Sequence, residues 1–158
     1  VRFKERDVRE MGRAAAGVAA IRLRKEDRVA GLDIIETGRR EPGNGEREER
    51  TVTRTPNPDT RLLVVMANGF AKQTLLKDYK IQRRGGSGLK TAKVTPKTGM
   101  VVSANIVTDE TVEILAFSSK GQALKTKLAN VRVAGRATQG VRIMKLEPGD
   151  SIAGIVCL

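Results

Sequence analysis

The sequence predicts an all-β fold built from propeller-like repeats of four-stranded blades. Its apolar runs are short, rich in β-branched residues and separated by turn residues, and no window of useful length keeps the spacing of an amphipathic helix. The chain also repeats itself about every 50 residues, a length that suits one small sheet per copy. Because one such sheet cannot bury both faces alone, neighbouring copies must stack, as propeller blades do.

The repeats are visible by sliding the sequence along itself. A shift of 123 lays residues 2–35 on 125–158 without a gap, with 12 identities among 34 positions. A shift of 71 reveals a middle copy, in which Asp78, Arg84 and Gly88 stand where the first copy has Asp7, Arg13 and Gly17. We therefore expect a blade-like repeat over 1–36 that lacks its first strand, and complete blade-like repeats over 61–110 and 111–158.

Residues 37–60 separate the first two repeats and read as a polar insertion. The segment is rich in Gly, Pro, Thr and charge, which favours an exposed and mobile loop. It holds five arginines and five acidic residues, so the positive excess of the chain belongs to the repeats.

Each repeat predicts short strands joined by turns. LLVVMANGFAKQTL reads as a hairpin with a two-residue Asn68-Gly69 turn, and EILAFSSKGQALKT repeats it with Lys120-Gly121 at the tip. GLKTAKV and GVRIMKL follow as further strands, and MVVSANIV and SIAGIVCL come after PKTG and EPGD turns. The pattern gives about four strands per repeat, with a core of Val, Ile, Leu and Ala because aromatic residues make up only 3% of the chain.

The net charge of +12 favours a polyanionic partner, with nucleic acid first and an anionic membrane surface second. No apolar run approaches the roughly 18 residues of a membrane span, and the charged start VRFKERDVRE is unlike a signal peptide. We expect a cytoplasmic protein that does not enter a membrane.

Three aligned positions are basic in all three repeats, and we call them the basic columns. They are Arg9/Lys80/Arg132, Arg13/Arg84/Arg136 and Arg22/Lys93/Lys145. At the chain's Lys and Arg content, a fully basic column arises by accident at a rate under about one in a hundred. Common descent of solvated positions is the alternative interpretation. Equivalent positions on successive blades share one edge, so the columns predict a continuous positive rim.

Duplex DNA fits such a rim better than a single strand. Single-strand recognition stacks bases on aromatic side chains, whereas the four aromatic residues here, Phe3, Phe70, Tyr79 and Phe117, form no cluster in the sequence. No helix is predicted that could enter a major groove. Contacts should therefore go mainly to phosphates, with sequence sensed through DNA bendability.

Catalytic and metal-binding functions find little support. Without histidine, Ser-His-Asp and Cys-His sites are impossible, and Cys157 has no second soft ligand for zinc and reads as an inert buried thiol. GRAAAGV and GRATQGV resemble the start of a phosphate-binding P-loop but lack its lysine and Ser/Thr. Tyr79 reads as a packing residue. We expect neither catalytic residues nor a metal ligand.

QRRGGSG, residues 82–88, resembles the gyrase box of the C-terminal domain of the bacterial DNA gyrase A subunit, and RFKERDVREMGRAAAGV and VAGRATQGV are similar to other repeats of that domain. The resemblance implies a six-bladed β-pinwheel, about half of it present, whose basic rim wraps duplex DNA. It implies that Arg83 and Arg84 contact the DNA backbone while glycines allow a tight turn. The DNA-binding candidates are then the basic columns together with Gln82, Arg83, Arg84, Gly85, Gly86, Gly88 and Lys90.

The same resemblance implies partners and a division of labour. The partners would be duplex DNA, the rest of the gyrase A subunit, and the gyrase B subunit in a heterotetramer. ATP and Mg²⁺ would serve elsewhere in that enzyme, so this chain would bind no cofactor and have no turnover alone. Ser87 departs from the box, which usually has Lys or Arg there, and should weaken one phosphate contact. The related topoisomerase IV domain and a scaffold that binds an acidic protein remain as alternatives.

Overall fold

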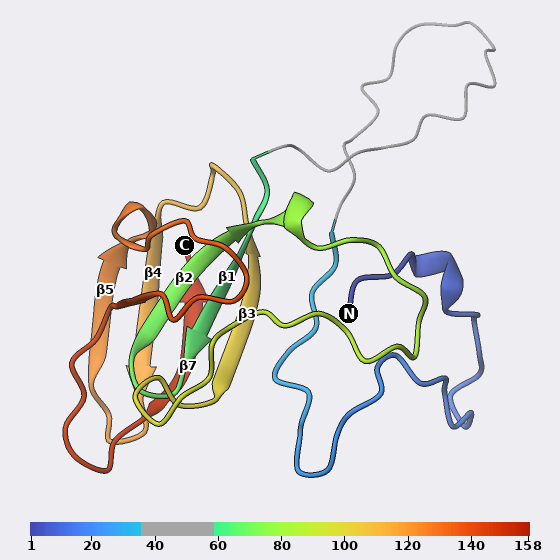
Figure 1. Cartoon of the computed structure of the whole chain (residues 1–158), viewed down its shortest axis with the longest axis horizontal. Coiled ribbons are helices and arrows are strands. Elements are labelled where there is room, and N and C mark those ends of the chain that lie inside the picture. The colour runs from blue at the N-terminus through green and yellow to red at the C-terminus, as the bar shows by residue number, and fades with distance from the viewer. Residues whose placement is uncertain (36–58) are drawn as a thin grey trace, which may run out of the picture.

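The computed structural model describes residues 1–35 and 59–158 (Figure 1), so most of the predicted insertion 37–60 lies outside the described residues. The described residues contain strands and short 3-10 helices, with no α-helix among them. The strands are β1 (Arg61–Met66), β2 (Phe70–Leu75), β3 (Val101–Val107), β4 (Glu113–Ser118), β5 (Ala123–Lys127), β6 (Val141–Arg142) and β7 (Ile152–Cys157). The 3-10 helices are η1 (Glu5–Asp7), η2 (Leu76–Asp78) and η3 (Leu128–Asn130). The all-β prediction is confirmed.

The strands form two antiparallel sheets, and in Figure 1 β4 and β5 lie to the left of β1 and β3 while β7 runs behind β2. The four-stranded sheet has the order β3-β1-β2-β6, and the three-stranded sheet has the order β5-β4-β7. Strand β6 comes from the last repeat, yet it pairs with β2 of the middle repeat through Phe70↔Arg142 and Ala71↔Val141. A four-stranded blade is thus completed by its neighbour, which the repeat pattern alone did not predict.

The two predicted hairpins form, but their turns are longer than predicted. Met66 pairs with Phe70, which leaves a three-residue loop, and the Gly69 amide donates to the Met66 carbonyl at 3.1 Å. The loop at 119–121 is the same, with the Gly121 amide donating to the Ser118 carbonyl at 3.1 Å. Both glycines have positive φ, +78° and +88°, as a type I turn followed by a left-handed residue requires. The prediction of two-residue turns was wrong because it assumed a primed turn.

The prediction of about four strands per repeat holds for 111–158, which contains β4 to β7, but not for the two repeats before it. Residues 1–35 contain no strand, 88–94 contain none, and only Val141–Arg142 of GVRIMKL is a strand. These segments still pair with neighbouring repeats, but through isolated backbone hydrogen bonds rather than ladders. The residues of these segments favour strands, but within the described residues they have too few partner strands to form regular ladders.

The main core joins the two sheets and is aliphatic, as expected. It consists of Leu63, Val65, Ala71, Val107, Ile114, Ala116, Leu128, Val131, Met144 and Ile152. Full burial of each Val, Leu, Ile or Met side chain stabilises the fold by about 1.5–3 kcal/mol. The opposite face of the four-stranded sheet is covered as well, around Val64, Met66, Phe70 and Ala92. Tyr79 is buried, and its hydroxyl lies 2.7 Å from the Thr91 Oγ1 atom, which suits a packing residue.

Candidate nucleic-acid interface

Three equivalent turns, 12–17, 83–88 and 135–140, carry the second basic column, and we call them the rim turns. Each ends at a glycine with positive φ: Gly17 at +80°, Gly88 at +74° and Gly140 at +77°. Residues with side chains adopt this conformation at a cost of about 1–2 kcal/mol, so the repeated glycine fixes a repeated backbone path.

Each of the last two rim turns lies against the repeat before it. The Gly85 amide donates to the Ala20 carbonyl at 2.8 Å, and the Arg22 amide donates to the Gly86 carbonyl at 2.9 Å. One repeat later, the Lys93 amide donates to the Thr138 carbonyl at 3.0 Å in the equivalent contact. The third basic column is thereby placed beside the rim turns, Arg22 next to 83–88 and Lys93 next to 135–140.

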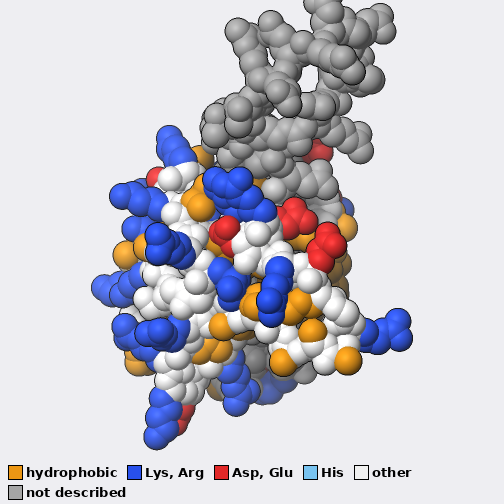
Figure 2. Space-filling view, turned by 90° about the vertical axis from the view of Figure 1, so that its right-hand side faces the viewer, with side chains coloured by type: hydrophobic (Ala, Val, Ile, Leu, Met, Phe, Trp, Pro, Cys, Tyr) orange, Lys and Arg blue, Asp and Glu red, His pale blue; other side chains and the backbone are white. Residues whose placement is uncertain are grey.

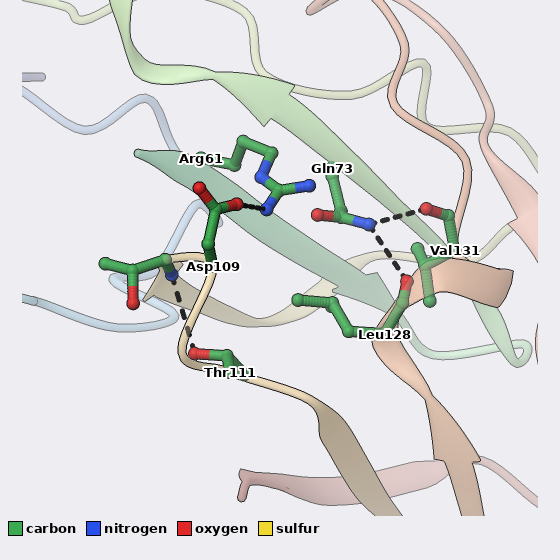
Figure 3. A network of polar contacts seen from close by, with 7 residues as sticks. Arg61, Gln73, Asp109, Thr111, Leu128 and Val131 are labelled. Carbon is green, nitrogen blue, oxygen red and sulfur yellow. Dashed lines mark hydrogen bonds and ion pairs between the residues drawn. The ribbon is translucent and has the colours of Figure 1, made fainter. Parts of the chain in front are cut away.

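A second pair of equivalent contacts sets the orientation of successive repeats. The Gln73 side chain donates through Nε2 to the carbonyls of Leu128 and Val131, at 3.0 and 2.6 Å (Figure 3). In the repeat before, the Arg2 guanidinium donates to the carbonyls of Leu76 and Tyr79, at 3.2 and 3.1 Å. Because both junctions use the same geometry, equivalent side chains recur on the same side of the molecule.

Figure 3 also shows an ion pair at the start of β1. The Arg61 Nη2 atom lies 2.6 Å from the Asp109 Oδ1 atom. Arg61 stands outside the basic columns, and its charge is used within the fold. It therefore does not belong to the interface.

The two arginines of the 82–88 motif have different environments. The Arg84 guanidinium donates to the Asp7 carbonyl at 3.1 Å and to the Ala19 carbonyl at 2.6 Å, so it ties the motif to the first repeat. Arg83 is exposed, and its side chain has no hydrogen bond or ion pair among the described residues. Arg83 is therefore the arginine of the motif that is available to a partner, while Arg84 holds the turn that presents it.

The other predicted site residues are placed as follows. Arg9, Arg13, Arg22, Lys80, Lys90, Lys93, Arg132 and Lys145 are exposed, whereas Gln82, Gly85, Gly86, Gly88 and Arg136 are half-buried. Figure 2 shows Lys and Arg side chains projecting along one edge of the face it draws, with few acidic ones among them. The structure brings Arg22 to the second rim turn and Lys93 to the third.

Two basic residues that the columns missed surround Phe70. The Lys97 ammonium lies 5.8 Å and the Arg142 guanidinium 5.2 Å from the centre of its ring, within cation–π range. Both line a hollow of about 350 Å³ together with Lys145 and two acidic residues, Glu147 and Asp150. Arg142 aligns with Lys90 in the middle repeat but with Ala19 in the first. Its position is therefore not basic in all three repeats and is not one of the basic columns.

The described residues offer no group of three or more His, Cys, Asp or Glu side chains that could hold a metal ion. They also contain no helix long and apolar enough to cross a membrane. Cys157 is half-buried, and burial, followed by the charge of Asp33, raises the pKa of its thiol. A raised pKa keeps this thiol protonated and poorly nucleophilic.

The sequence profile described as DNA gyrase C-terminal domain, beta-propeller, matches residues 1–36, 62–108 and 113–158. The chain belongs to this family. The DNA gyrase A subunit of Mycolicibacterium smegmatis is 37% identical over 157 residues, and that of Staphylococcus epidermidis is 34% identical over 155. Each match covers 98% of this chain but only 16% and 15% of the relative, so the chain spans about a sixth of the gyrase A subunits it matches.

Solved structures agree with the family. The structure of a DNA gyrase A C-terminal domain superposes with a TM-score of 0.74 at 27% identity, covering 98% of this chain and 45% of the other. The C-terminal domain of a DNA topoisomerase IV gives 0.56 at 30% identity, covering 63% and 30%. The β-pinwheel prediction is confirmed.

Proposed function

We propose that this chain binds and wraps duplex DNA as the C-terminal domain of a gyrase A subunit, in support of ATP-dependent negative supercoiling by the whole type II topoisomerase. The observation that carries the proposal is the repeated junction between repeats, which brings Arg22 and Lys93 beside successive rim turns. A duplex that follows these turns meets basic side chains at each repeat. Several kcal/mol of DNA bending can be offset by many such contacts on a curved surface.

The proposed partners follow from this role. They are duplex DNA, the remainder of the gyrase A subunit, and the gyrase B subunit, in the cytoplasm of a bacterium. ATP and Mg²⁺ belong, in this proposal, to other parts of the assembly, and this chain supplies binding without turnover. The nearly complete QRRGGSG motif favours gyrase over topoisomerase IV.

Replacing Arg83 by alanine tests the DNA contact directly. Arg83 is exposed and unpaired among the described residues, so its loss should weaken duplex affinity roughly tenfold at low salt and lower the salt slope by about one. Titration of a labelled duplex by fluorescence anisotropy at several salt concentrations measures both quantities. The matched control is Lys77→Ala, which removes one exposed charge outside the columns.

Three results would argue against the proposal. Affinity that does not respond to salt would exclude a phosphate contact. Equal effects of Arg83→Ala and Lys77→Ala would mean that only net charge matters. An acidic protein that displaces duplex DNA at physiological salt would favour the scaffold alternative.

A further inference from the structure

Lys72 is a charged side chain that is completely buried. It lies on β2 with an exposed fraction of 0% and is the largest of the fully buried side chains among the described residues. Its ammonium donates to the Gly135 carbonyl at 2.7 Å and to the Arg136 carbonyl. Buried lysines are normally paired with a carboxylate, whereas the partners of this one are backbone carbonyls of the third rim turn.

The same strand holds the turn at other points. The Thr74 hydroxyl donates to the Ala134 carbonyl at 2.9 Å, so three successive carbonyls, 134 to 136, receive hydrogen bonds from β2 side chains. At the far end of the turn, a Cβ on Gly140 would lie only 2.3 Å from the Ala71 carbonyl oxygen. The third rim turn is therefore seated on β2 at both of its ends.

The contact with β2 places a buried positive charge beneath the third rim turn. The carbonyl dipoles are directed toward the buried ammonium, and the charge of Arg136 acts on the same group. Two positive charges at one turn favour an anion there. The equivalent positions in the other repeats hold Val1 and Leu124, so within this chain the arrangement belongs to the third rim turn.

We propose that Lys72 is a positioning residue of the interface, which holds the third rim turn and supplies, from beneath it, positive charge that helps the turn bind a DNA phosphate. The inference rests on the proposed function of the rim. Lys72 does not touch the phosphate in this account. It acts through the orientation of residues 135–140 and through its field.

Protonation of Lys72 gives the proposal a measurable signature. Burial, followed by the charge of Arg136, lowers the pKa of Lys72 from 10.5 to about 8. Its neighbour across the sheet, Val64, is apolar, so Arg136 is the charge that acts on this pKa. Between about pH 8 and pH 10.5 the folded chain has released this proton while the unfolded chain keeps it. The free energy of unfolding therefore rises with pH over this range, because the cost of burying the charge is removed. DNA affinity should fall over the same range because the charge under the turn disappears.

The test compares duplex affinity at pH 7 and pH 9 at constant ionic strength, with the N-terminus of the 158-residue chain acetylated so that its α-amine does not titrate. Lys72→Met should bind roughly three- to tenfold more weakly than the original chain at pH 7, and the difference should shrink at pH 9, where the charge is lost and only the hydrogen bonds to the turn distinguish the two chains. Lys77→Met, the control for net charge, should keep the pH profile of the original chain. Thermal unfolding at both pH values should show stability rising with pH in the original chain relative to Lys72→Met.

Parallel pH profiles for the original chain and Lys72→Met would overturn the role of Lys72. If circular dichroism shows that Lys72→Met does not fold, the profile of the original chain decides, and a profile without a fall centred near pH 8 overturns the proposal. A different result would contradict the proposed function itself. In that case even the original chain at pH 7 shows no salt-dependent duplex binding.

Discussion

Replacing Gly140 by alanine is expected to destabilise the chain by roughly 2–4 kcal/mol and to displace the third rim turn. Gly140 has φ +77°, and an added Cβ would lie 2.3 Å from the Ala71 oxygen and 2.8 Å from its carbon. Both neighbours are backbone atoms of a central strand, so the turn must move rather than the strand. Since β6 begins at the next residue, its pairing with β2 should weaken as well. Urea unfolding followed by circular dichroism measures the loss of stability.

Gly135→Ala is the matched control for this prediction. Gly135 opens the same turn, has no positive φ, and has no atom within 4 Å of an added Cβ. Its replacement should change stability by less than about 0.5 kcal/mol. If the two variants unfold at the same urea concentration, the close approach of the turn to β2 does not exist in solution.

Removing one whole basic column is expected to weaken duplex DNA binding more than any other change proposed for this chain. The variant Arg22→Ala, Lys93→Ala, Lys145→Ala loses three exposed charges, and the fold places two of them, Arg22 and Lys93, beside the rim turn of the next repeat. With a slope of about 0.9 per phosphate contact, the salt slope should fall by nearly three and affinity at low salt by roughly a hundredfold or more. Anisotropy titrations across a salt series measure both.

A second triple variant separates position from net charge. Lys25→Ala, Lys77→Ala, Lys127→Ala removes the same number of exposed positive charges from outside the columns. It should lower affinity only through the smaller net charge and leave most of the slope intact. Equal losses in the two variants would show that the columns are ordinary solvated positions kept by common descent.

The sequence predicts those features that depend on local chemistry repeated several times. The hairpins at 61–75 and 113–127 follow from β-branched runs around a glycine, and the basic columns emerge because three copies can be compared. The turn length was misjudged because Asn-Gly suits a two-residue loop, while the strand register here closes at Met66↔Phe70 and leaves three residues.

Features that depend on contacts between repeats could not be predicted in the same way. The transfer of β6 into the preceding sheet, the use of Arg84 to tie two repeats together, and the burial of Lys72 each involve a partner more than 50 positions away. The second basic column contains Arg84 but does not predict its contact with the first repeat, and no basic column contains Lys72. Lys72 in particular aligns with Val1 and Leu124, so its alignment suggests an apolar position while its structure is that of a buried cation.

The central claim is that the rim turns and basic columns form one curved surface that bends duplex DNA. Its most direct test is energy transfer between dyes on the two ends of a short duplex, measured as the 158-residue chain is added at low and at physiological salt. The account predicts that transfer rises on binding, that high salt reverses it, and that the column variant Arg22→Ala, Lys93→Ala, Lys145→Ala lowers the transfer of the bound complex. Tight binding with transfer unchanged from that of free duplex would contradict it.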